Sequence, residues 1–238
     1  MEFKKKEIIG MIHLAGPDVV EKAMEEIKIY EEEGLSGIII ENYHGNTSEV
    51  LKVLSRLEHQ PTSLSVGINI LPNEFEFAFK LCDDYEFIDF IQLDYIAGAY
   101  AIGDKVIKLD ADKFIELSMN HSKVEVYGGV WPKYYKPLKD SVLSVDLFDA
   151  VFLGSAVVVT GEGTGYETPL DKVKEFATLI DGKAPLIVGA GLTAENVKEQ
   201  LEFAQGGIVG SAFKPNGRTQ QMVDRDLVKA FMDEVKKL

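Results

Sequence analysis

Short apolar runs alternate with helical patterns along the whole chain, and this alternation limits the fold more than any other feature of the sequence. The runs Glu7–His13 and Gly37–Glu41 are rich in isoleucine, and the apolar positions of Asp18–Glu33 between them recur with helical spacing. Continuous β-branched runs are typical of parallel strands that are buried on both faces. Eight such strands joined by right-handed helical crossovers close into a barrel.

The alternation therefore predicts an α/β fold, a single-domain (β/α)8 TIM barrel over residues 1–238, a length close to the roughly 250 residues of this fold. A doubly wound open sheet is the alternative, but it does not explain why every run ends in a polar residue or a glycine turn. The other strands are expected at Leu64–Ile70, Phe87–Leu93, Val124–Tyr127, Ala156–Thr160, Leu186–Val188 and Ile208–Val209, with a short extended piece at Val106–Leu109. The other helices are expected from Asn46 and at Asn73–Cys82, Ala111–His121, Ser141–Leu153, Leu170–Ile180 and Asp224–Lys237.

A further helix is expected between the last two strands, and this helix and the last one carry finer expectations. Thr193 is expected to cap a helix between the last two strands, because a hydroxyl there can accept a first-turn N–H. The last helix is expected to turn Leu227, Phe231 and Val235 inward.

Charge and composition argue against several classes of partner. The formal net charge of −14 repels nucleic acid and anionic membrane surfaces. Membrane insertion is not expected, because no apolar run approaches the roughly 18 residues that a span needs. Cys82 is the single cysteine, so no intrachain disulfide can form, and a cytoplasmic protein is expected.

Two glycine-rich turns follow the last two strands. They are Gly189-Ala190-Gly191 and Gly210-Ser211-Ala212. In eight-stranded barrels the loops after strands 7 and 8 often hold a phosphate on backbone N–H groups. We therefore predict an anion site formed by Gly189, Gly191, Gly210 and Ser211. The alternative is that these glycines only make tight turns from strand to helix.

Two further features accompany this predicted anion site. Thr160 precedes the sequence GEGTG, in which Gly161, Gly163 and Thr164 resemble a phosphate loop. Glu162 opposes this interpretation unless its side chain turns away. Lys214 lies four residues past Gly210 and can place its ammonium over an anion, although a solvated loop lysine has the same sequence signature.

Polar residues end the earlier strands, at the barrel rim where such folds carry their chemistry. His13, Glu41 and Asp94 are the candidates for proton transfer. The alternatives are a histidine hydrogen-bonded in the barrel mouth and carboxylates paired with an internal lysine. Asn69 and Gln92 can orient a hydroxyl or a carbonyl. No His/Cys spacing predicts a zinc site and no cofactor is required, but Glu41 and Asp94 leave a divalent cation such as Mg²⁺ open.

The loop Trp131–Lys139 interleaves aromatic residues with lysines. It can form a lid that stacks on a planar group, but packing on the barrel rim or in an oligomer interface is the more common role of such a loop. The remaining histidines are expected to be incidental: His44, His59 and His121.

Several segments together resemble the BtpA/SgcQ family. They are IIGMIHL, GIIIEN, VGINIL, AVVVTGEGTG, LIVGAGLTAENV and GGIVGSAFKPNG, and the resemblance is strongest from Ala156 to Asp224. It implies a barrel similar to ribulose-phosphate-binding TIM barrels. The family is named after a factor needed for photosystem I accumulation, other members occur beside sugar-uptake and sugar-kinase genes, and its reaction is not established.

The chain departs from the family pattern at the ends of strands 1 to 3 and 5. The usual proline-rich turn is reduced at His13–Pro17, an aspartate is missing from Glu41–Asn46, an arginine from Asn69–Glu74, and a lysine and histidine from Tyr127–Gly129. The resemblance thus implies a divergent branch that keeps the phosphate side and either takes another substrate or has lost catalysis.

These features predict an enzyme that acts on a small phosphorylated metabolite, either a sugar phosphate or a nucleotide-like compound. Isomerisation, aldol-type cleavage and hydrolysis all fit. The alternatives are a non-catalytic biogenesis, assembly or metabolite-binding factor, and a metal-dependent lyase using Glu41 and Asp94. The expected partner is the small ligand alone, and the surface permits a homo-oligomer.

Overall fold

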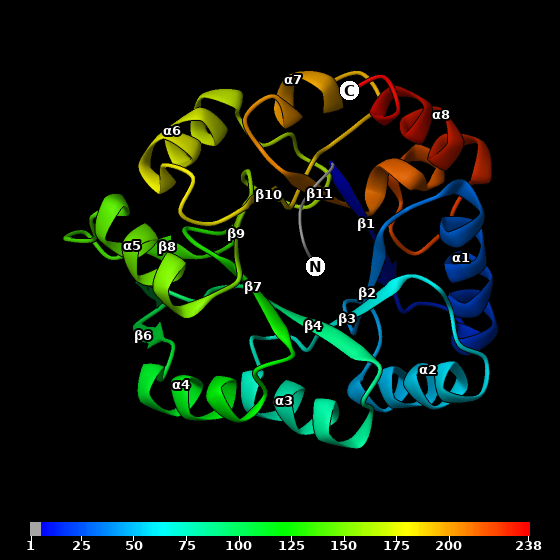
Figure 1. The fold of residues 1–238 in the computed structure, drawn as a ribbon, viewed down its shortest axis with the longest axis horizontal. Helices are drawn as coiled ribbons and strands as arrows, with labels where there is room; N and C mark the ends of the chain where they lie inside the picture. The colour runs from blue at the N-terminus through cyan, green and yellow to red at the C-terminus, as the bar shows by residue number, and fades with distance from the viewer. Residues whose placement is uncertain (1–5) are drawn as a thin grey trace.

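Eight parallel strands close into a barrel that helices surround (Figure 1). The computed structural model describes residues 6–238, and residues 1–5 lie outside the described part. Around the barrel the strands follow the order β1, β2, β3, β4, β7, β9, β10, β11 and return to β1. The predicted (β/α)8 fold is confirmed.

The elements lie close to the positions that the apolar runs predict. The barrel strands are β1 (Glu7–His13), β2 (Gly37–Glu41), β3 (Ser65–Asn69), β4 (Ile88–Leu93), β7 (Glu125–Gly129), β9 (Ala156–Val159), β10 (Leu186–Val188) and β11 (Gly206–Val209). The helices are α1 (Val19–Glu33), α2 (Thr47–His59), α3 (Phe75–Asp84), α4 (Ala111–Asn120), α5 (Leu143–Leu153), α6 (Leu170–Ile180), α7 (Val197–Leu201) and α8 (Arg225–Val235), with two short 3-10 helices, η1 (Ser211–Phe213) and η2 (Pro215–Gly217).

Local sequence signals set several helix ends. Asn46 accepts a hydrogen bond from the Glu49 backbone N–H, and the Glu49 side chain accepts one from Asn46 N–H, so a capping box begins α2. Gly34 ends α1 in the left-handed conformation with φ of 82°. These contacts fix where each crossover helix meets its strand.

Strand alternation divides the apolar residues into two cores, because successive side chains point to opposite faces. One set packs outward under the helices. The other fills the barrel interior and consists of Ile9, Met11, Ile39, Phe90, Tyr127, Ala156, Val158, Ile187 and Ile208. The interior is therefore a packed core, and any ligand must lie above it at the rim.

A small antiparallel sheet stands beside the barrel. It contains β5 (Ala99–Ile102), β6 (Lys105–Lys108) and β8 (Lys136–Pro137). The sequence predicted only one extended piece, Val106–Leu109, in this region. The hairpin forms because Gly103, with φ of 57°, makes the turn between β5 and β6, and β8 pairs with the other edge of β5.

Two helix predictions need correction. Thr193 does not cap α7: Asn196 holds the cap position, and its Oδ1 accepts a hydrogen bond from the Thr193 backbone N–H at 2.8 Å. On α8 the buried residues are Val228, Phe231 and Met232, whereas Leu227 is 39% exposed. The inward face of α8 is thus rotated relative to the predicted one.

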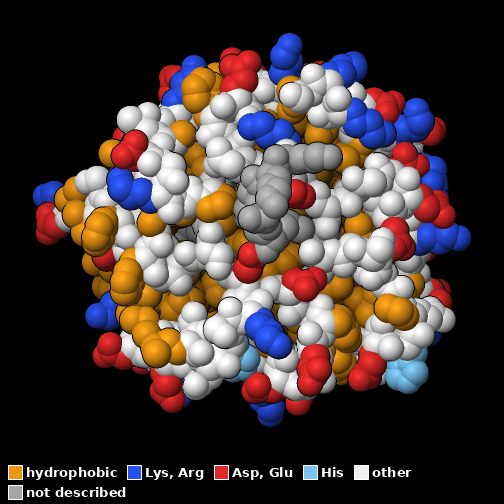
Figure 2. Space-filling model, in the orientation of Figure 1, with side chains coloured by type: hydrophobic (Ala, Val, Ile, Leu, Met, Phe, Trp, Pro, Cys, Tyr) orange, Lys and Arg blue, Asp and Glu red, His pale blue; other side chains and the backbone are white. Residues whose placement is uncertain are grey.

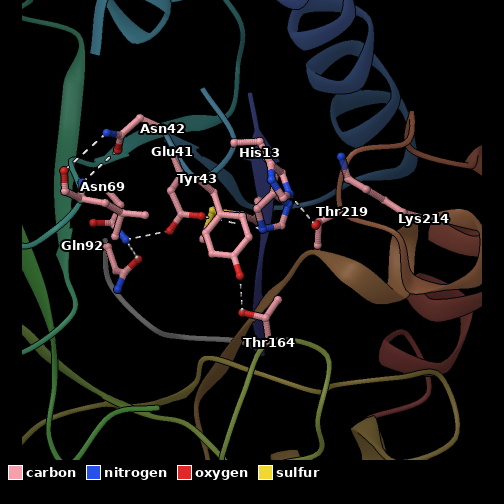
Figure 3. A network of polar contacts seen from close by, with 12 residues as sticks. His13, Glu41, Asn42, Tyr43, Asn69, Gln92, Thr164, Lys214 and Thr219 are labelled. Carbon is pink, nitrogen blue, oxygen red and sulfur yellow. Dashed lines mark hydrogen bonds and ion pairs between the residues drawn. The ribbon is translucent and has the colours of Figure 1, made fainter. Parts of the chain in front are cut away.

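Lys214 joins the loop after β11 to the outer helix layer. Its ammonium lies 2.8 Å from Glu26 Oε1 on α1 and 3.0 Å from the Gln221 carbonyl oxygen, and the residue is 1% exposed. This placement corrects both interpretations of Lys214, the anion-binding one and the solvated one. In Figure 3 its ammonium points toward α1, away from the barrel mouth. Burial makes this ion pair a structural contact.

None of the helices in residues 6–238 has the length and apolar character that crossing a bilayer requires.

Lys214→Met should destabilise the protein strongly, because it leaves the Glu26 carboxylate buried without its cation. The expected loss in the free energy of unfolding is about 3–5 kcal/mol, measured by urea denaturation. The double variant Lys214→Met/Glu26→Gln should recover more than half of that loss. A loss below about 1 kcal/mol for the single variant would show that the pair is not structural.

Candidate active site

A ring of eight residues forms the rim of the barrel, one at or next to the end of each strand. Each lies two positions after an inward-facing residue, so the five side chains among them face the barrel axis. Around the ring they are His13, Glu41, Asn69, Gln92, Gly129, Thr160, Gly189 and Gly210. His13 pairs with Glu41 in the ladder, and Glu41 pairs with Asn69, so these three lie at one level.

The ring carries polar side chains on one side and small residues on the other. β1 to β4 contribute a histidine, a carboxyl and two carboxamides, whereas β7 to β11 contribute three glycines and one threonine. Over this ring lies a cavity of about 240 Å³. The predicted site residues that line it are His13, Glu41, Asn69, Gln92, Asp94, Thr160, Thr164, Gly189, Gly191, Gly210 and Ser211.

Gly161 and Gly163 do not line the cavity, which corrects their predicted role in a phosphate loop. A Cβ on Gly161 would lie 2.7 Å from the Glu167 carbonyl oxygen, so close backbone packing accounts for the glycine there. A Cβ on Gly163 would lie 3.2 Å from the Tyr166 ring. Within GEGTG, the cavity contacts come from Thr164 and Gly165.

Glu41 is a buried carboxyl at the carboxyl end of β2. It is 6% exposed, and its Oε1 accepts a hydrogen bond from Asn69 Nδ2 at 2.9 Å. Burial raises the pKa of Glu41 from 4.5 to about 7, with the nearby Lys133 ammonium opposing this rise and Asp94 adding to it. The carboxyl can therefore both accept and release a proton near neutral pH.

His13 faces Glu41 across the rim. Its Nε2 lies 3.7 Å from Glu41 Oε2, and burial, together with the charges of Lys214 and Lys133, lowers its pKa well below the usual value. The imidazole is therefore neutral at pH 7, and its contact with Glu41 is not an ion pair. His13 Nδ1 is buried and has no hydrogen-bond partner among residues 6–238.

Asn69 connects the polar residues of the rim, as Figure 3 shows. Its Nδ2 lies 2.9 Å from Glu41 Oε1, 2.8 Å from Gln92 Oε1 and 3.5 Å from Asp94 Oδ1. Two N–H groups thus face three oxygens, which holds the Glu41 and Asp94 side chains near one another.

The same oxygens are the groups that a hard divalent cation prefers. Two carboxyl groups and the Gln92 carboxamide supply them. No cluster of three or more His, Cys, Asp and Glu side chains suited to a metal occurs in residues 6–238. Asn69 Nδ2 now lies where the oxygens converge. A cation here would need the Asn69 carboxamide to rotate, so that its oxygen faces the cluster.

Three loops meet above the cavity at Thr164. Its Oγ1 lies 3.1 Å from Lys133 Nζ and 3.3 Å from the Tyr43 hydroxyl, and its backbone N–H donates to the Tyr134 hydroxyl at 2.9 Å. Tyr135 donates a hydrogen bond to Asp94 Oδ2 at 2.9 Å. The loop Trp131–Lys139 therefore packs on the rim, and Lys133, Tyr134 and Tyr135 also line the cavity.

Four of these lining residues were not among the predicted site residues: Tyr43, Lys133, Tyr134 and Tyr135. Lys133, Tyr134 and Tyr135 lie four to six residues after β7, so strand spacing does not indicate which way they point, and the available signal was the aromatic and basic composition of their loop. Tyr43 lies two residues after β2. His44 also proves less incidental than expected, because its Nε2 contacts Thr219 Oγ1 at 2.7 Å and its ring lies 4.7 Å from that of Tyr43.

The two glycine turns after β10 and β11 both border the cavity, as the sequence predicted. Gly191 has φ of 69°, and a Cβ there would lie 2.1 Å from the Tyr166 carbonyl oxygen, so the tight-turn interpretation accounts for this glycine. The N–H groups of Ser211 and Ala212, the first two positions of η1, have no acceptor among residues 6–238. Of these two residues only Ser211 lines the cavity, so its N–H is the donor that a ligand there can reach.

Glu41→Gln should stabilise the protein at high pH. The folded state holds the Glu41 proton more tightly than the unfolded state, so this group's contribution is full below pH 4.5 and is lost as pH rises through 7. At pH 8 the neutral variant should be more stable by roughly 3 kcal/mol, and below pH 5 the difference should nearly vanish. Urea denaturation at both pH values measures this.

Glu58→Gln, an exposed position on α2, is the matched control and should show no such pH dependence. Equal stability of Glu41→Gln and the natural protein at pH 8 would contradict the raised pKa of Glu41.

Solved structures of the same fold share little sequence with this chain. One titled native KDPGal structure matches with a TM-score of 0.63 at 11% identity, covering 97% of this chain and 94% of that one. N-(5'-phosphoribosyl)anthranilate isomerase from Pyrococcus furiosus matches with a TM-score of 0.65 at 16% identity, covering 98% and 100%. At these identities the likeness concerns the fold alone.

Sequence relatives are closer. An uncharacterized protein of Methanocaldococcus jannaschii, MJ1115, is 29% identical over 259 aligned residues, covering 99% of this chain and 97% of that protein. The photosystem I biogenesis protein BtpA of Synechocystis is 26% identical, covering 95% of this chain and 86% of that protein. The BtpA family model matches residues 4–237. The chain therefore belongs to the BtpA family.

Proposed function

We propose that the protein is an enzyme that transfers a proton on a small phosphorylated metabolite held in the rim cavity. The observation that carries this proposal is the buried Glu41 carboxyl in the cavity, whose pKa is raised to about 7. Across the rim from Glu41 lie the three glycines and Thr160, which leave space for a ligand. A carboxyl poised near the working pH is what general acid–base catalysis requires. Perturbed carboxyls in a cavity are frequent at catalytic sites.

In this proposal, one side of the rim transfers the proton and the other side binds the phosphate. Glu41 is the proton acceptor and donor, and neutral His13 is the second group that can exchange a proton with the substrate. Asn69 and Gln92 orient a hydroxyl or carbonyl beside them. Asp94 keeps Tyr135 on the rim. Isomerisation and retro-aldol cleavage of a sugar phosphate both begin with such a proton transfer.

The phosphate belongs on the opposite side of the cavity. Its donors are the N–H group of Ser211, the Thr164 hydroxyl and the Lys133 ammonium, all from residues that line the cavity. Lys133 replaces Lys214 in this role, because its Nζ lies at the cavity beside Thr164. The volume of about 240 Å³ favours a sugar phosphate over a nucleotide, since larger ligands occupy roughly 300–1,000 Å³.

A divalent cation such as Mg²⁺ is compatible with this proposal but not required by it. Glu41 and Asp94, with the carboxamide oxygens of Asn69 and Gln92, are the residues that would hold it. Such an ion supplies Lewis-acid polarisation of a substrate oxygen. Its affinity should be pH-dependent, since Glu41 must lose its proton first.

A non-catalytic biogenesis or metabolite-binding factor is the second candidate, because one relative is named as a photosystem I biogenesis protein. The two candidates differ in what they need from Glu41. A binding factor needs its cavity and surface, whereas the enzyme needs a titrating carboxyl. We also place the protein in the cytoplasm, where its single buried Cys82, with a thiol pKa raised to about 12, stays reduced.

Inorganic phosphate should raise the melting temperature of the natural protein by about 3 °C at ten times its Kd, because it binds the folded state only. Lys133→Met should reduce this shift to less than about half, since it removes the cation at the cavity. Lys139→Met, in the same loop but exposed, is the matched control and should keep the shift. Equal shifts in all three proteins would exclude the proposed anion site.

Proton transfer is tested by deuterium exchange into a panel of aldose and ketose phosphates in D₂O, followed by ¹H NMR. The natural protein should exchange the hydrogen next to the carbonyl of at least one member. Glu41→Gln should bind that member but exchange it about 100-fold or more slowly, because the acid–base group is gone. Binding without exchange in the natural protein would favour the binding factor instead.

A further inference from the structure

Helix α5 carries an apolar stripe on its outer face. Val142, Val145, Phe148 and Phe152 follow one another at intervals of three or four residues, which places them on one side of the helix. They are 54%, 55%, 71% and 76% exposed, respectively. A helix that packs against a barrel normally shows polar residues on this face.

The β5–β6 hairpin extends this stripe. Ile102 and Val106 near its tip are 49% and 61% exposed. The base of the hairpin lies against α5, because a Cβ on Gly98 would be only 3.0 Å from Asp146 Oδ2. Figure 2 shows hydrophobic side chains gathered along the left edge of the molecule, over α5 and β6. We call these six residues of α5 and the hairpin the α5–hairpin surface.

The area of this surface is large for a lone subunit. At about 200 Å² for a whole aromatic residue, Phe148 and Phe152 together expose about 300 Å². The four β-branched residues bring the total to roughly 600 Å², the upper end of the largest apolar patch on a typical monomer. A standard interface buries about 800 Å² per partner, which this surface and its charged border together can supply.

The charges around the surface are balanced, unlike those of the whole chain. Segments 99–108 and 139–153 together hold three lysines and four aspartates, so their formal net charge is −1. The formal net charge of the whole chain is −14. The exposed members, among them Lys105, Lys108 and Asp149, form no ion pair with another described residue. Two copies of this acidic chain repel one another least when they meet through a surface whose positive and negative charges are balanced.

We propose that the α5–hairpin surface is the interface of a homodimer, with a second copy of this chain as its occupant. A two-fold interface presents the same surface on both subunits, so it must be apolar in the centre and carry both signs of charge at its border. The α5–hairpin surface meets both conditions. An acidic or a basic partner protein would instead require a border of one sign.

The proposed dimer also bears on the cavity. Asp146 of α5 accepts a hydrogen bond from the Trp131 indole N–H at 2.7 Å, and Trp131 begins the loop that carries Lys133 over the cavity. Fixing α5 in an interface would therefore restrain this loop. The dimer does not depend on the proposed reaction, so either inference can fail alone.

Sedimentation velocity and light scattering of the full-length chain test the proposal. At about 100 µM, well above a Kd of 1 µM, the natural protein should have twice the monomer mass of 26.4 kDa. The double variant Phe148→Lys/Phe152→Lys should run as a folded monomer, with a circular dichroism spectrum like that of the natural protein. Met119→Lys, at a 75% exposed position on α4, is the matched control and should stay dimeric.

A natural protein that is monomeric at about 100 µM would overturn the proposal, because an obligate or stable interface would be occupied there. A dimer that survives the double Phe→Lys change would also overturn it, since the contact would then lie elsewhere. If the double variant does not fold, Val145→Lys replaces it. Its expected result is at least a tenfold rise in the dimer dissociation constant, and an unchanged constant counts against the proposal.

Discussion

Closure of the parallel sheet is the constraint on which the rest of the structure depends. It brings the carboxyl ends of eight strands to one rim, and the ladder register then decides which residues share a level. His13, Glu41 and Asn69 are successive ladder partners, so a carboxyl and an imidazole become neighbours without any special loop. A one-residue slip in β2 would point Glu41 into the helix layer instead.

The polar half of the rim costs stability that the remainder of the barrel offsets. Glu41 is buried without a direct cation, and His13 Nδ1 and Asn69 Oδ1 have no hydrogen-bond partner within residues 6–238. Trp131 and Tyr134 hold positive φ of 47° and 70° in the loop above, which is unfavourable for bulky residues. Strain and unpaired polar atoms gather at functional sites, where they serve pre-organisation. His13, Asn69 and Tyr134 all line the cavity in which we propose the chemistry.

Much of the fold could be predicted from the sequence, because buried parallel strands leave a strong signal. The β-branched runs located all eight barrel strands, and the polar and glycine residues that end these runs located most of the rim. The β5–β6 hairpin was not predicted as a hairpin, because its strands are short and largely exposed. The turn residue Gly103 is its main signal in the sequence.

The candidate site was predicted less completely, for reasons of side-chain direction. Lys214 and Lys133 each follow a rim glycine by four residues, yet Lys214 turns behind the rim to Glu26 and Lys133 lies at the cavity. Spacing along a loop does not determine that choice; the position of α1 and its buried carboxylate does. Likewise, composition marked Tyr134 and Tyr135 as a loop of interest, but only the fold shows that they reach Thr164 and Asp94.

The proposed chemistry requires the Glu41 carboxyl to titrate near neutrality inside the rim cavity. The most direct measurement is ¹³C NMR of glutamate side-chain carboxyls between pH 4 and 9, with Glu41 assigned as the resonance that is missing in Glu41→Gln. We expect a midpoint near pH 7. A midpoint near the ordinary value of 4.5 would contradict it, because an ionised Glu41 could not serve as the proton donor at neutral pH.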